Sequence, residues 1–170
     1  MNLSTLYLRL RYPRHTFGPG FRGPWRLRIR GRGRVTFGRE VRVKNASGRT
    51  ALLTFGADAR IEIGDRVEID GAGLMSASSI LVGDDAILGP CLLVDTDFHA
   101  LGPQRRRIGE PVTRRPIRIG RNAWIQGKST ILKGASVGEG AVVRWGALVA
   151  GDVGPGVVVM GNPALPVARA

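Results

Sequence analysis

β-Branched aliphatic residues recur at every sixth position in the C-terminal third of the chain. From Ile119 to Gly154 this rhythm is uninterrupted, and the fifth position of each hexad is always Ala, Ser or Val. A helix does not explain the period, because six residues drift around a turn of about 3.6 residues and bury no consistent stripe. The hexads predict a solenoid in which each hexad forms a short strand and a corner, and three hexads close one triangular coil. The first positions, expected to point to the axis, are Ile119, Ile125, Ile131, Val137, Val143 and Val149, and the fifth positions are Ala123, Ser129, Ala135, Ala141, Ala147 and Val153.

A less regular form of the same rhythm lies upstream. Its expected axis positions are Ile63, Ile69, Met75, Val82, Leu88 and Val94. Between Val94 and Ile117 the rhythm stops, which predicts an excursion loop at about 97–117. We therefore expect an all-β chain, with a basic N-terminal cap over 1–34 and a β-helix domain over 35–170. A sandwich of short strands is the alternative, but sandwich strands lack a fixed six-residue period.

Composition agrees with a turn-rich, repetitive domain. The 170 residues suffice for one domain, and they include 25 glycines while aromatic residues make up only 6 %. No run of about 18 apolar residues occurs, which argues against a membrane-spanning helix. The single Cys91 cannot form an intrachain disulfide, and no Cys/His cluster offers a zinc site. We expect a cytoplasmic protein that holds no metal.

Charge is distributed unevenly along the chain. Residues 1–50 contain 13 Lys and Arg against one acidic residue, a net charge of +12. Residues 51–100 contain two against nine, a net of −7, and residues 101–170 contain 11 against three, a net of +8. Such asymmetry indicates a polyanionic partner, which leaves nucleic acid, anionic lipid and a phosphate-rich small molecule open.

The basic N-terminal region allows more than one interpretation. Leu3, Leu6, Tyr7 and Leu10 fall at helical spacing, so a short amphipathic helix could make a peripheral contact with an anionic membrane or could cap the open end of the solenoid. The tract Arg26–Arg34 could grip the phosphates of a nucleic acid. Its alternation of arginine with apolar residues also fits an end coil with one solvated face, so nucleic-acid binding is the minor alternative.

Two motifs add to the hexads. The segment Val94–His99 reads VDTDFH, and GNPA lies near the C-terminus at Gly161–Ala164. Together with the hexads, these motifs resemble the hexapeptide-repeat acyltransferases, and within them the branch of maltose, galactoside and capsular-sugar O-acetyltransferases. The resemblance covers about residues 35–165. It implies a left-handed parallel β-helix, a homotrimer with active sites between subunits, and a role in polysaccharide biosynthesis. The implied reaction moves an acetyl group from acetyl-CoA to a hydroxyl of a sugar or saccharide.

His99 is the candidate general base. Acyl transfer from a thioester to a hydroxyl needs a base near the hydroxyl, and imidazole, with a reference pKa of about 6.5, suits that task at neutral pH. His99 lies where the repeat breaks, and the resemblance places the catalytic histidine of the family at this position. Asp95 or Asp97 could orient the imidazole or bind a sugar hydroxyl, or both could be turn residues; Asp97 is the second catalytic candidate. No Gly-x-Ser-x-Gly elbow is present, which favours direct attack over a covalent intermediate.

The resemblance also implies a donor site, from which this sequence departs in part. Trp124 matches the family and would flank the pantetheine arm of the donor, while Gly127 and Gly146 stand where the donor approaches the backbone closely. Trp145 stands where relatives often carry Ala, and Ala150, Gly151 and Leu165 replace residues that relatives often use. The cations expected to bind the donor phosphates are Lys128, Lys133, Arg144 and the loop arginines Arg105, Arg106 and Arg107.

Two other functions are possible on the same fold. A noncatalytic solenoid that serves as an assembly surface would also show these hexads. A metal-dependent hydratase needs three histidines at each site, and the chain has only His15 and His99.

Overall fold

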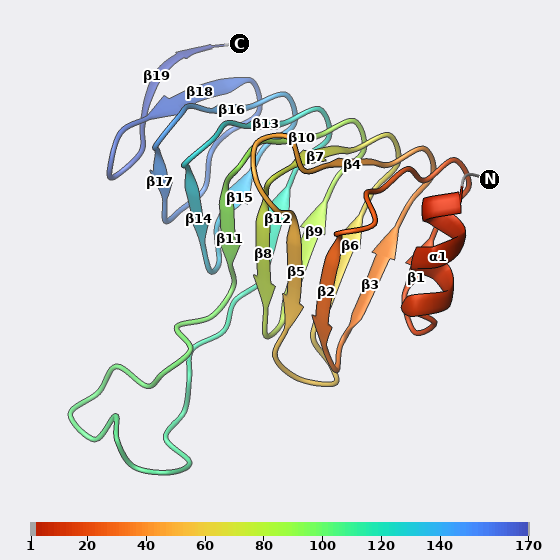
Figure 1. Ribbon diagram of the computed structural model, residues 1–170. Coiled ribbons are helices and arrows are strands. Elements are labelled where there is room, and N and C mark those ends of the chain that lie inside the picture. The colour runs from red at the N-terminus through yellow and green to blue at the C-terminus, as the bar shows by residue number, and fades with distance from the viewer. Residues whose placement is uncertain (1–2, 170) are drawn as a thin grey trace.

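The computed structural model describes residues 3–169 and shows a left-handed parallel β-helix of about six coils. Its coils stack side by side along one axis, with one helix at the N-terminal end (Figure 1). Consecutive strands go to three different sheets, so the solenoid is triangular in section. The predicted all-β fold class is confirmed.

Each sheet takes one strand from each coil, and the three are called sheets A, B and C here. Sheet A holds β1 (Thr16–Phe17), β3 (Arg34–Phe37), β6 (Arg60–Ile63), β9 (Ser79–Val82), β12 (Ile117–Ile119) and β15 (Ser136–Val137). Sheet B holds β4 (Arg42–Lys44), β7 (Glu68–Asp70), β10 (Ile87–Leu88), β13 (Trp124–Ile125), β16 (Val142–Val143) and β18 (Val157–Met160), with β19 (Leu165–Arg169) antiparallel at its edge. Sheet C holds β2 (Arg28–Gly31), β5 (Ala51–Thr54), β8 (Gly73–Ser76), β11 (Leu92–Val94), β14 (Thr130–Leu132) and β17 (Leu148–Val149). Strands β1 and β2 lie upstream of residue 35, so coils begin within the basic N-terminal region.

The hexad positions form the core, as predicted. Every first and fifth position from Ile119 to Val153 is buried. The registers stack these side chains in columns: Ile125 pairs with Val143 in sheet B, and Ile131 pairs with Val149 in sheet C. Because each coil buries its apolar positions only against its neighbours, the columns stabilise the whole stack rather than any single coil.

Two expected axis positions upstream are wrong by one residue. Leu74 and Leu93 are fully buried in sheet C, and Leu93 pairs with Ile131 of the next coil. Met75 and Val94 are the next residues along their strands. The corner between sheets B and C is one residue shorter in these two coils, so the inward position falls one residue closer to the N-terminus.

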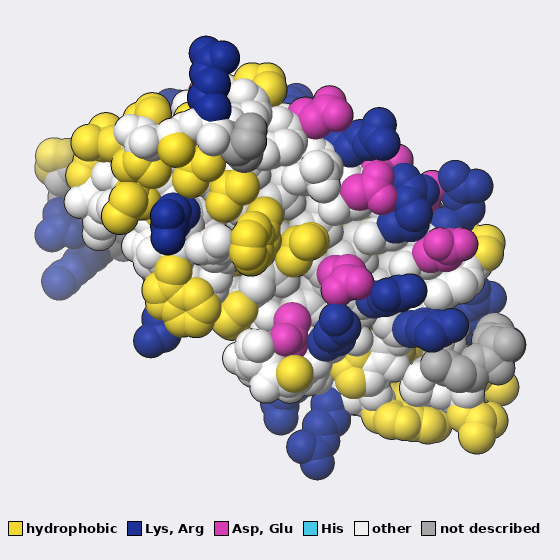
Figure 2. Space-filling model, turned by 90° about the horizontal axis from the view of Figure 1, so that it is seen from above, with side chains coloured by type: hydrophobic (Ala, Val, Ile, Leu, Met, Phe, Trp, Pro, Cys, Tyr) yellow, Lys and Arg dark blue, Asp and Glu magenta, His cyan; other side chains and the backbone are white. Residues whose placement is uncertain are grey.

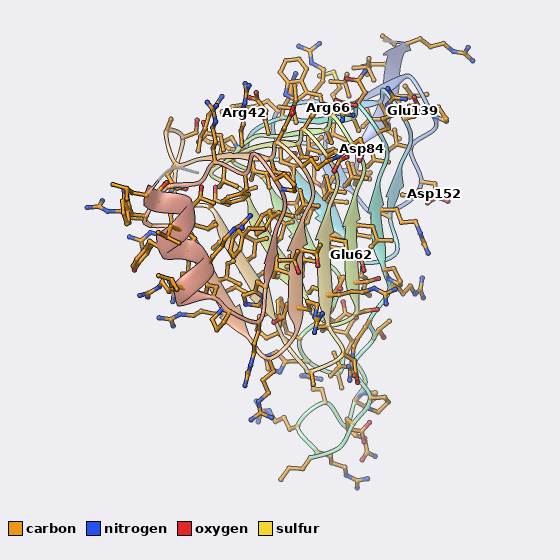
Figure 3. The ribbon with its side chains drawn as sticks, turned by 90° about the vertical axis from the view of Figure 1, so that its right-hand side faces the viewer. Arg42, Glu62, Arg66, Asp84, Glu139 and Asp152 are labelled. Carbon is orange, nitrogen blue, oxygen red and sulfur yellow. The ribbon has the colours of Figure 1, made fainter. Side chains whose placement is uncertain are left out.

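Charged side chains join neighbouring coils along the corner between sheets A and B. Arg66 and Asp85 occupy equivalent places in successive coils, both with left-handed backbone (φ 57° and 60°). The Nε atom of Arg66 lies 2.7 Å from the Asp85 carboxylate, which Arg121 of the following coil also approaches at 3.5 Å. Figure 3 shows Arg66 and Asp84 on this edge. This row of charged side chains is distant from the excursion, because the excursion leaves at the corner between sheets C and A.

The helix α1 (Leu3–Arg11) covers the open end of the first coil. Leu8 is fully buried in the core, and the Thr5 hydroxyl donates to the carbonyl of Phe21 (2.9 Å). The predicted helix is confirmed, and its capping face is the one that carries Thr5 and Leu8. Its other apolar residues, which set the predicted spacing, are exposed: Leu3, Leu6 and Leu10. Within residues 3–169, no helix has both the length and the apolar character needed to cross a membrane.

Candidate active site

The excursion connects β11 to β12 and projects away from the coils (Figure 1). Its two legs are joined at the root, where the amide of Asp97 donates to the carbonyl of Thr113 (3.1 Å) and the amide of Arg115 donates to the carbonyl of Asp95 (3.0 Å). These bonds fix the first residues of the excursion against the solenoid, although the loop beyond them stands free of the coils.

Asp95 is a structural residue at this root. Its side chain is fully buried, and it accepts hydrogen bonds from the Ser76 hydroxyl (2.7 Å) and from the amides of Ala77 (2.6 Å) and Ser78 (2.9 Å). A carboxylate so engaged caps the corner of the preceding coil and is not exposed to bind a substrate. The expectation that Asp95 could orient the candidate base or bind a sugar is therefore wrong.

His99 is presented to solvent by a tight turn. The amide of Phe98 donates to the Thr96 hydroxyl (3.2 Å), the amide of His99 donates to the Asp97 carbonyl (2.7 Å), and Phe98 has left-handed backbone (φ 61°). The Phe98 ring packs edge-on against Phe55 of an earlier coil, with centroids 5.1 Å apart. The His99 side chain is exposed, and its imidazole has no hydrogen-bond partner within the described part of the chain. The turn is thus anchored on both sides of an imidazole that remains open to a substrate.

Asp97 forms an ion pair that was not predicted from the sequence. The Nζ atom of Lys133 lies 2.6 Å from Oδ1 of Asp97, and the two side chains are only 25 % and 16 % exposed. Lys133 follows β14, which pairs with β11, so the pair joins the excursion to the next coil. The structure brings Asp97 and Lys133 together and shows no side-chain hydrogen bond from Asp97 to His99 among residues 3–169. The pair depends on the register of β11 on β14, which the sequence does not reveal.

Cys91 and His15 are both unsuited to catalysis in this structure. Burial raises the pKa of the Cys91 thiol to about 12, so the thiol stays protonated and is no nucleophile. His15 is half-buried, and its Nδ1 accepts a hydrogen bond from the amide of Val35 (3.1 Å). Burial, followed by the charges of Arg14 and Arg34, lowers the pKa of His15 and holds it neutral.

Most of the residues expected at the donor site gather at the corner between sheets B and C, whereas Lys133 pairs with Asp97 and the loop arginines lie in the excursion. The indole of Trp145 lies against the backbone of Gly127, where any Cβ would collide with it. The amide of Trp145 donates to Oε1 of Gln126 (3.1 Å), and the Lys128 ammonium lies 5.9 Å from the indole centroid. Trp145 is 60 % exposed, so the indole presents its outer surface to solvent. The sequence predicted that the donor would approach the backbone at Gly127, but the Trp145 indole occupies this position.

The remaining donor candidates lie close to this corner. Trp124 stands on the outer face of sheet B between Ile87 and Val142 and is 45 % exposed. Arg144 is exposed immediately before Trp145. Gly146 has left-handed backbone (φ 72°), and its amide donates to the carbonyl of Gly127 (3.0 Å), so the glycine is required by the turn.

The two groups of candidates are separated within one chain. His99 belongs to the corner between sheets C and A, whereas Trp145 and Lys128 belong to the corner between sheets B and C. The strands of sheet C lie between these two corners, and they are about 7–13 Å long at 3.3 Å per residue. Trp124 lies farther round, on sheet B. One chain therefore presents the His99 imidazole at one edge and an aromatic and basic surface at another.

Comparison with known proteins gives relatives by sequence. No protein-family model matches the chain. Nodulation protein L of Rhizobium meliloti is 33 % identical over 91 residues, which cover 54 % of this chain and 49 % of that protein. Galactoside O-acetyltransferase of Escherichia coli is 31 % identical over 85 residues, which cover 50 % of this chain and 41 % of that protein. The matched region thus covers less than half the length of each of these relatives.

Solved structures share the fold at lower identity. An N-acyltransferase from Bacillus cereus, in complex with dTDP and 3-hydroxybutyryl-CoA, has a TM-score of 0.76 at 18 % identity, covering 96 % of this chain and 87 % of its own. A hexapeptide-repeat acetyltransferase from Vibrio cholerae, complexed with acetyl-coenzyme A, has a TM-score of 0.60 at 19 % identity, covering 99 % and 79 %. The resemblance inferred from the motifs is confirmed.

Proposed function

We propose that this chain, which resembles the hexapeptide-repeat acyltransferases in both sequence and fold, is a CoA-dependent O-acetyltransferase. It would move an acetyl group from acetyl-CoA to a hydroxyl of a sugar or saccharide, in the cytoplasm and as part of polysaccharide biosynthesis. The observation that carries the proposal is the exposed, unpartnered imidazole of His99, held by an anchored turn at the break in the solenoid. The names of the galactoside O-acetyltransferase and of the acetyl-coenzyme A complex support the acceptor and the donor.

His99 would act as the general base of a direct transfer. The neutral imidazole takes the proton of the acceptor hydroxyl while its oxygen attacks the thioester carbonyl. The tetrahedral intermediate then expels the thiolate, which takes the proton back from the imidazolium, so the products are the acetyl ester and free CoA. Protonated, buried Cys91 supports this route over an acyl-cysteine intermediate.

The edge at Trp145 would hold the donor. The exposed indole offers a flat apolar surface for the pantetheine arm or the adenine ring, and Lys128 and Arg144 stand beside it to face phosphate. Trp124 on the neighbouring sheet would flank the arm. Gly127 and Gly146 would then serve the donor indirectly, by seating the indole and shaping its turn.

A homotrimer would complete the site. Because His99 and Trp145 lie at different edges of one chain, a cyclic assembly can place one subunit's excursion against its neighbour's donor edge. Light scattering should report a trimer that loses activity on dilution to monomer; a fully active monomer would contradict the shared site. Co-expression of His99→Ala with a Trp145→Asp variant should recover activity, because some sites then combine intact His99 with an intact donor edge.

The test of the activity is direct product detection. Purified protein is incubated with acetyl-CoA and a panel of sugars, amino sugars and lipid-linked saccharides, and acetylated products are identified by mass spectrometry. We expect an acetyl ester on at least one saccharide, together with release of free CoA. If no acceptor is acetylated and no CoA is released, the noncatalytic solenoid replaces the enzyme. The amino sugars separate O-acetylation from N-acylation, the activity in the name of the Bacillus cereus neighbour.

A further inference from the structure

The helix α1 has two apolar faces, and the cap uses only one. Thr5 and Leu8 face the core. Leu3, Leu6 and Leu10 lie on the opposite side of the helix and are 75 %, 40 % and 74 % exposed. A capping helix needs one apolar face, and its other side is ordinarily polar. Three leucines on the solvent side therefore indicate a second contact for this helix.

A basic, aromatic hollow borders the same helix at Tyr7 and Arg11. It is formed around Tyr7 of α1 and Trp25, whose rings are 5.1 Å apart, and it has a volume of about 620 Å³. Five arginines line it: Arg11, Arg26, Arg28, Arg30 and Arg49. Its lining residues, all within the described part of the chain, include no Asp or Glu.

Arg28 shows that the protein itself leaves a donor at this hollow unpartnered. Its Nε is buried, and it is the one buried side-chain nitrogen or oxygen without a hydrogen-bond partner among residues 3–169. Buried donors of this kind are satisfied in nearly all native structures, so an unpartnered Nε is exceptional. None of its five arginines forms an ion pair with an acidic residue in the described chain, in contrast to Arg39 and Arg42 farther along the coils.

We infer that this end of the solenoid docks on the surface of an anionic lipid bilayer. Leu3, Leu6 and Leu10 enter the boundary between head groups and acyl chains, Trp25 lies at the head-group level, and the arginines of the hollow bind lipid phosphates. Figure 2 shows basic and hydrophobic side chains side by side at the α1 end of the molecule. Stable attachment to a membrane takes two signals, and the structure supplies an apolar insertion and a basic patch together.

Two other occupants fit the observations less well. A nucleic acid would engage the arginines but would leave the leucines without a function. A second copy of this chain would bring two regions of net charge +12 together, which repel each other. Docking on a bilayer goes beyond the proposed acetyl transfer and is tested by binding alone, so its failure is distinguishable from failure of the enzyme.

Flotation of the full chain with lipid vesicles tests the inference. Vesicles of phosphatidylcholine alone are compared with vesicles that contain about one third phosphatidylglycerol, and we expect binding to the anionic vesicles only, falling as salt is raised. The double variant Arg26→Gln/Arg30→Gln should lower the partition coefficient by about 25-fold, at roughly fivefold for each arginine. The double variant Leu3→Ser/Leu10→Ser should lower it by at least about tenfold.

Matched controls come from the same chain. Leu101→Ser removes an equally exposed leucine in the excursion, and Arg118→Gln removes an exposed arginine on sheet A; both should bind as the wild type does. Circular dichroism and thermal melts establish that each variant is folded. Absence of binding to anionic vesicles would overturn the inference, as would full binding by the leucine variant. Binding to RNA that the leucine variant retains, without vesicle binding, would assign the patch to nucleic acid instead.

Discussion

The ion pair between Asp97 and Lys133 gives a prediction that separates two roles for Asp97. If the pair anchors the turn that carries His99, removal of either partner should have a similar effect. The substitutions are Asp97→Asn, which keeps the shape of the side chain, and Lys133→Met, which keeps the apolar stem. The Asp97 and Lys133 side chains are 16 % and 25 % exposed, so the contribution of the pair to stability should be intermediate. Exposed ion pairs contribute up to about 1 kcal/mol, and disruption of a buried pair costs about 3–5 kcal/mol. We therefore expect each single variant to lose about 2 kcal/mol of unfolding free energy.

The double variant completes the cycle. Once one partner is gone, removal of the other should cost little more, so the coupling energy should be about 1–2 kcal/mol. A turn displaced by about 1 Å can cost up to about 100-fold in turnover, so we expect each single variant to lose about 10- to 100-fold in kcat. The assays are denaturant unfolding and steady-state acetyl transfer on all four proteins.

A different result would assign Asp97 to the chemistry. If Asp97 orients the imidazole, Asp97→Asn should lose about 10⁴-fold in kcat while Lys133→Met remains nearly as active as the wild type. Unequal kcat losses of this kind, with additive stability losses, would refute the anchoring role.

Three further predictions concern the core, the first coil and the donor edge. Ile125→Ala should lower the unfolding free energy by about 2–5 kcal/mol in denaturant melts, because the side chain is fully buried between two coils; a loss below 0.5 kcal/mol would contradict the stacked column. The pKa of His15 is lowered in the fold, so the unfolded chain binds a proton first as the pH falls, and the unfolding free energy should decline below about pH 6.5. In His15→Asn, which retains an acceptor for the Val35 amide, this decline should be smaller; an unchanged decline would exclude His15 as its source. Trp145→Ala removes the indole from Gly127 and should raise KM for acetyl-CoA about tenfold with little change in kcat; an unchanged KM would place the donor elsewhere.

The solenoid could be predicted from the sequence because its signal is periodic and local. Each hexad repeats the same choice of residues, so the axis and wall positions from Ile119 to Val153 can be assigned without any knowledge of distant contacts. The frame fails at Met75 and Val94 because a corner can lose one residue without any change in composition. Helical spacing found α1, but spacing alone could not decide which of its two apolar faces would meet the core.

The site was only partly within reach of the sequence. The break in the rhythm located His99 and the excursion, since an interruption is visible against a regular background. The partner of Asp97 lies 36 residues along the chain on the neighbouring coil, and this pairing depends on corner lengths that the sequence does not reveal. Asp95 and Asp97 look alike in sequence, yet burial assigns one to a corner of the preceding coil and leaves the other at the turn.

Turnover of His99→Ala tests the central claim most directly. The variant is compared with the wild type and with the control His15→Asn, using acetyl-CoA and the acceptor identified by mass spectrometry, after circular dichroism has shown that all three are folded. Loss of a general base should lower kcat by about 10²–10⁴-fold, with KM for acetyl-CoA nearly unchanged because the imidazole faces the acceptor hydroxyl. Wild-type turnover by His99→Ala would contradict the account.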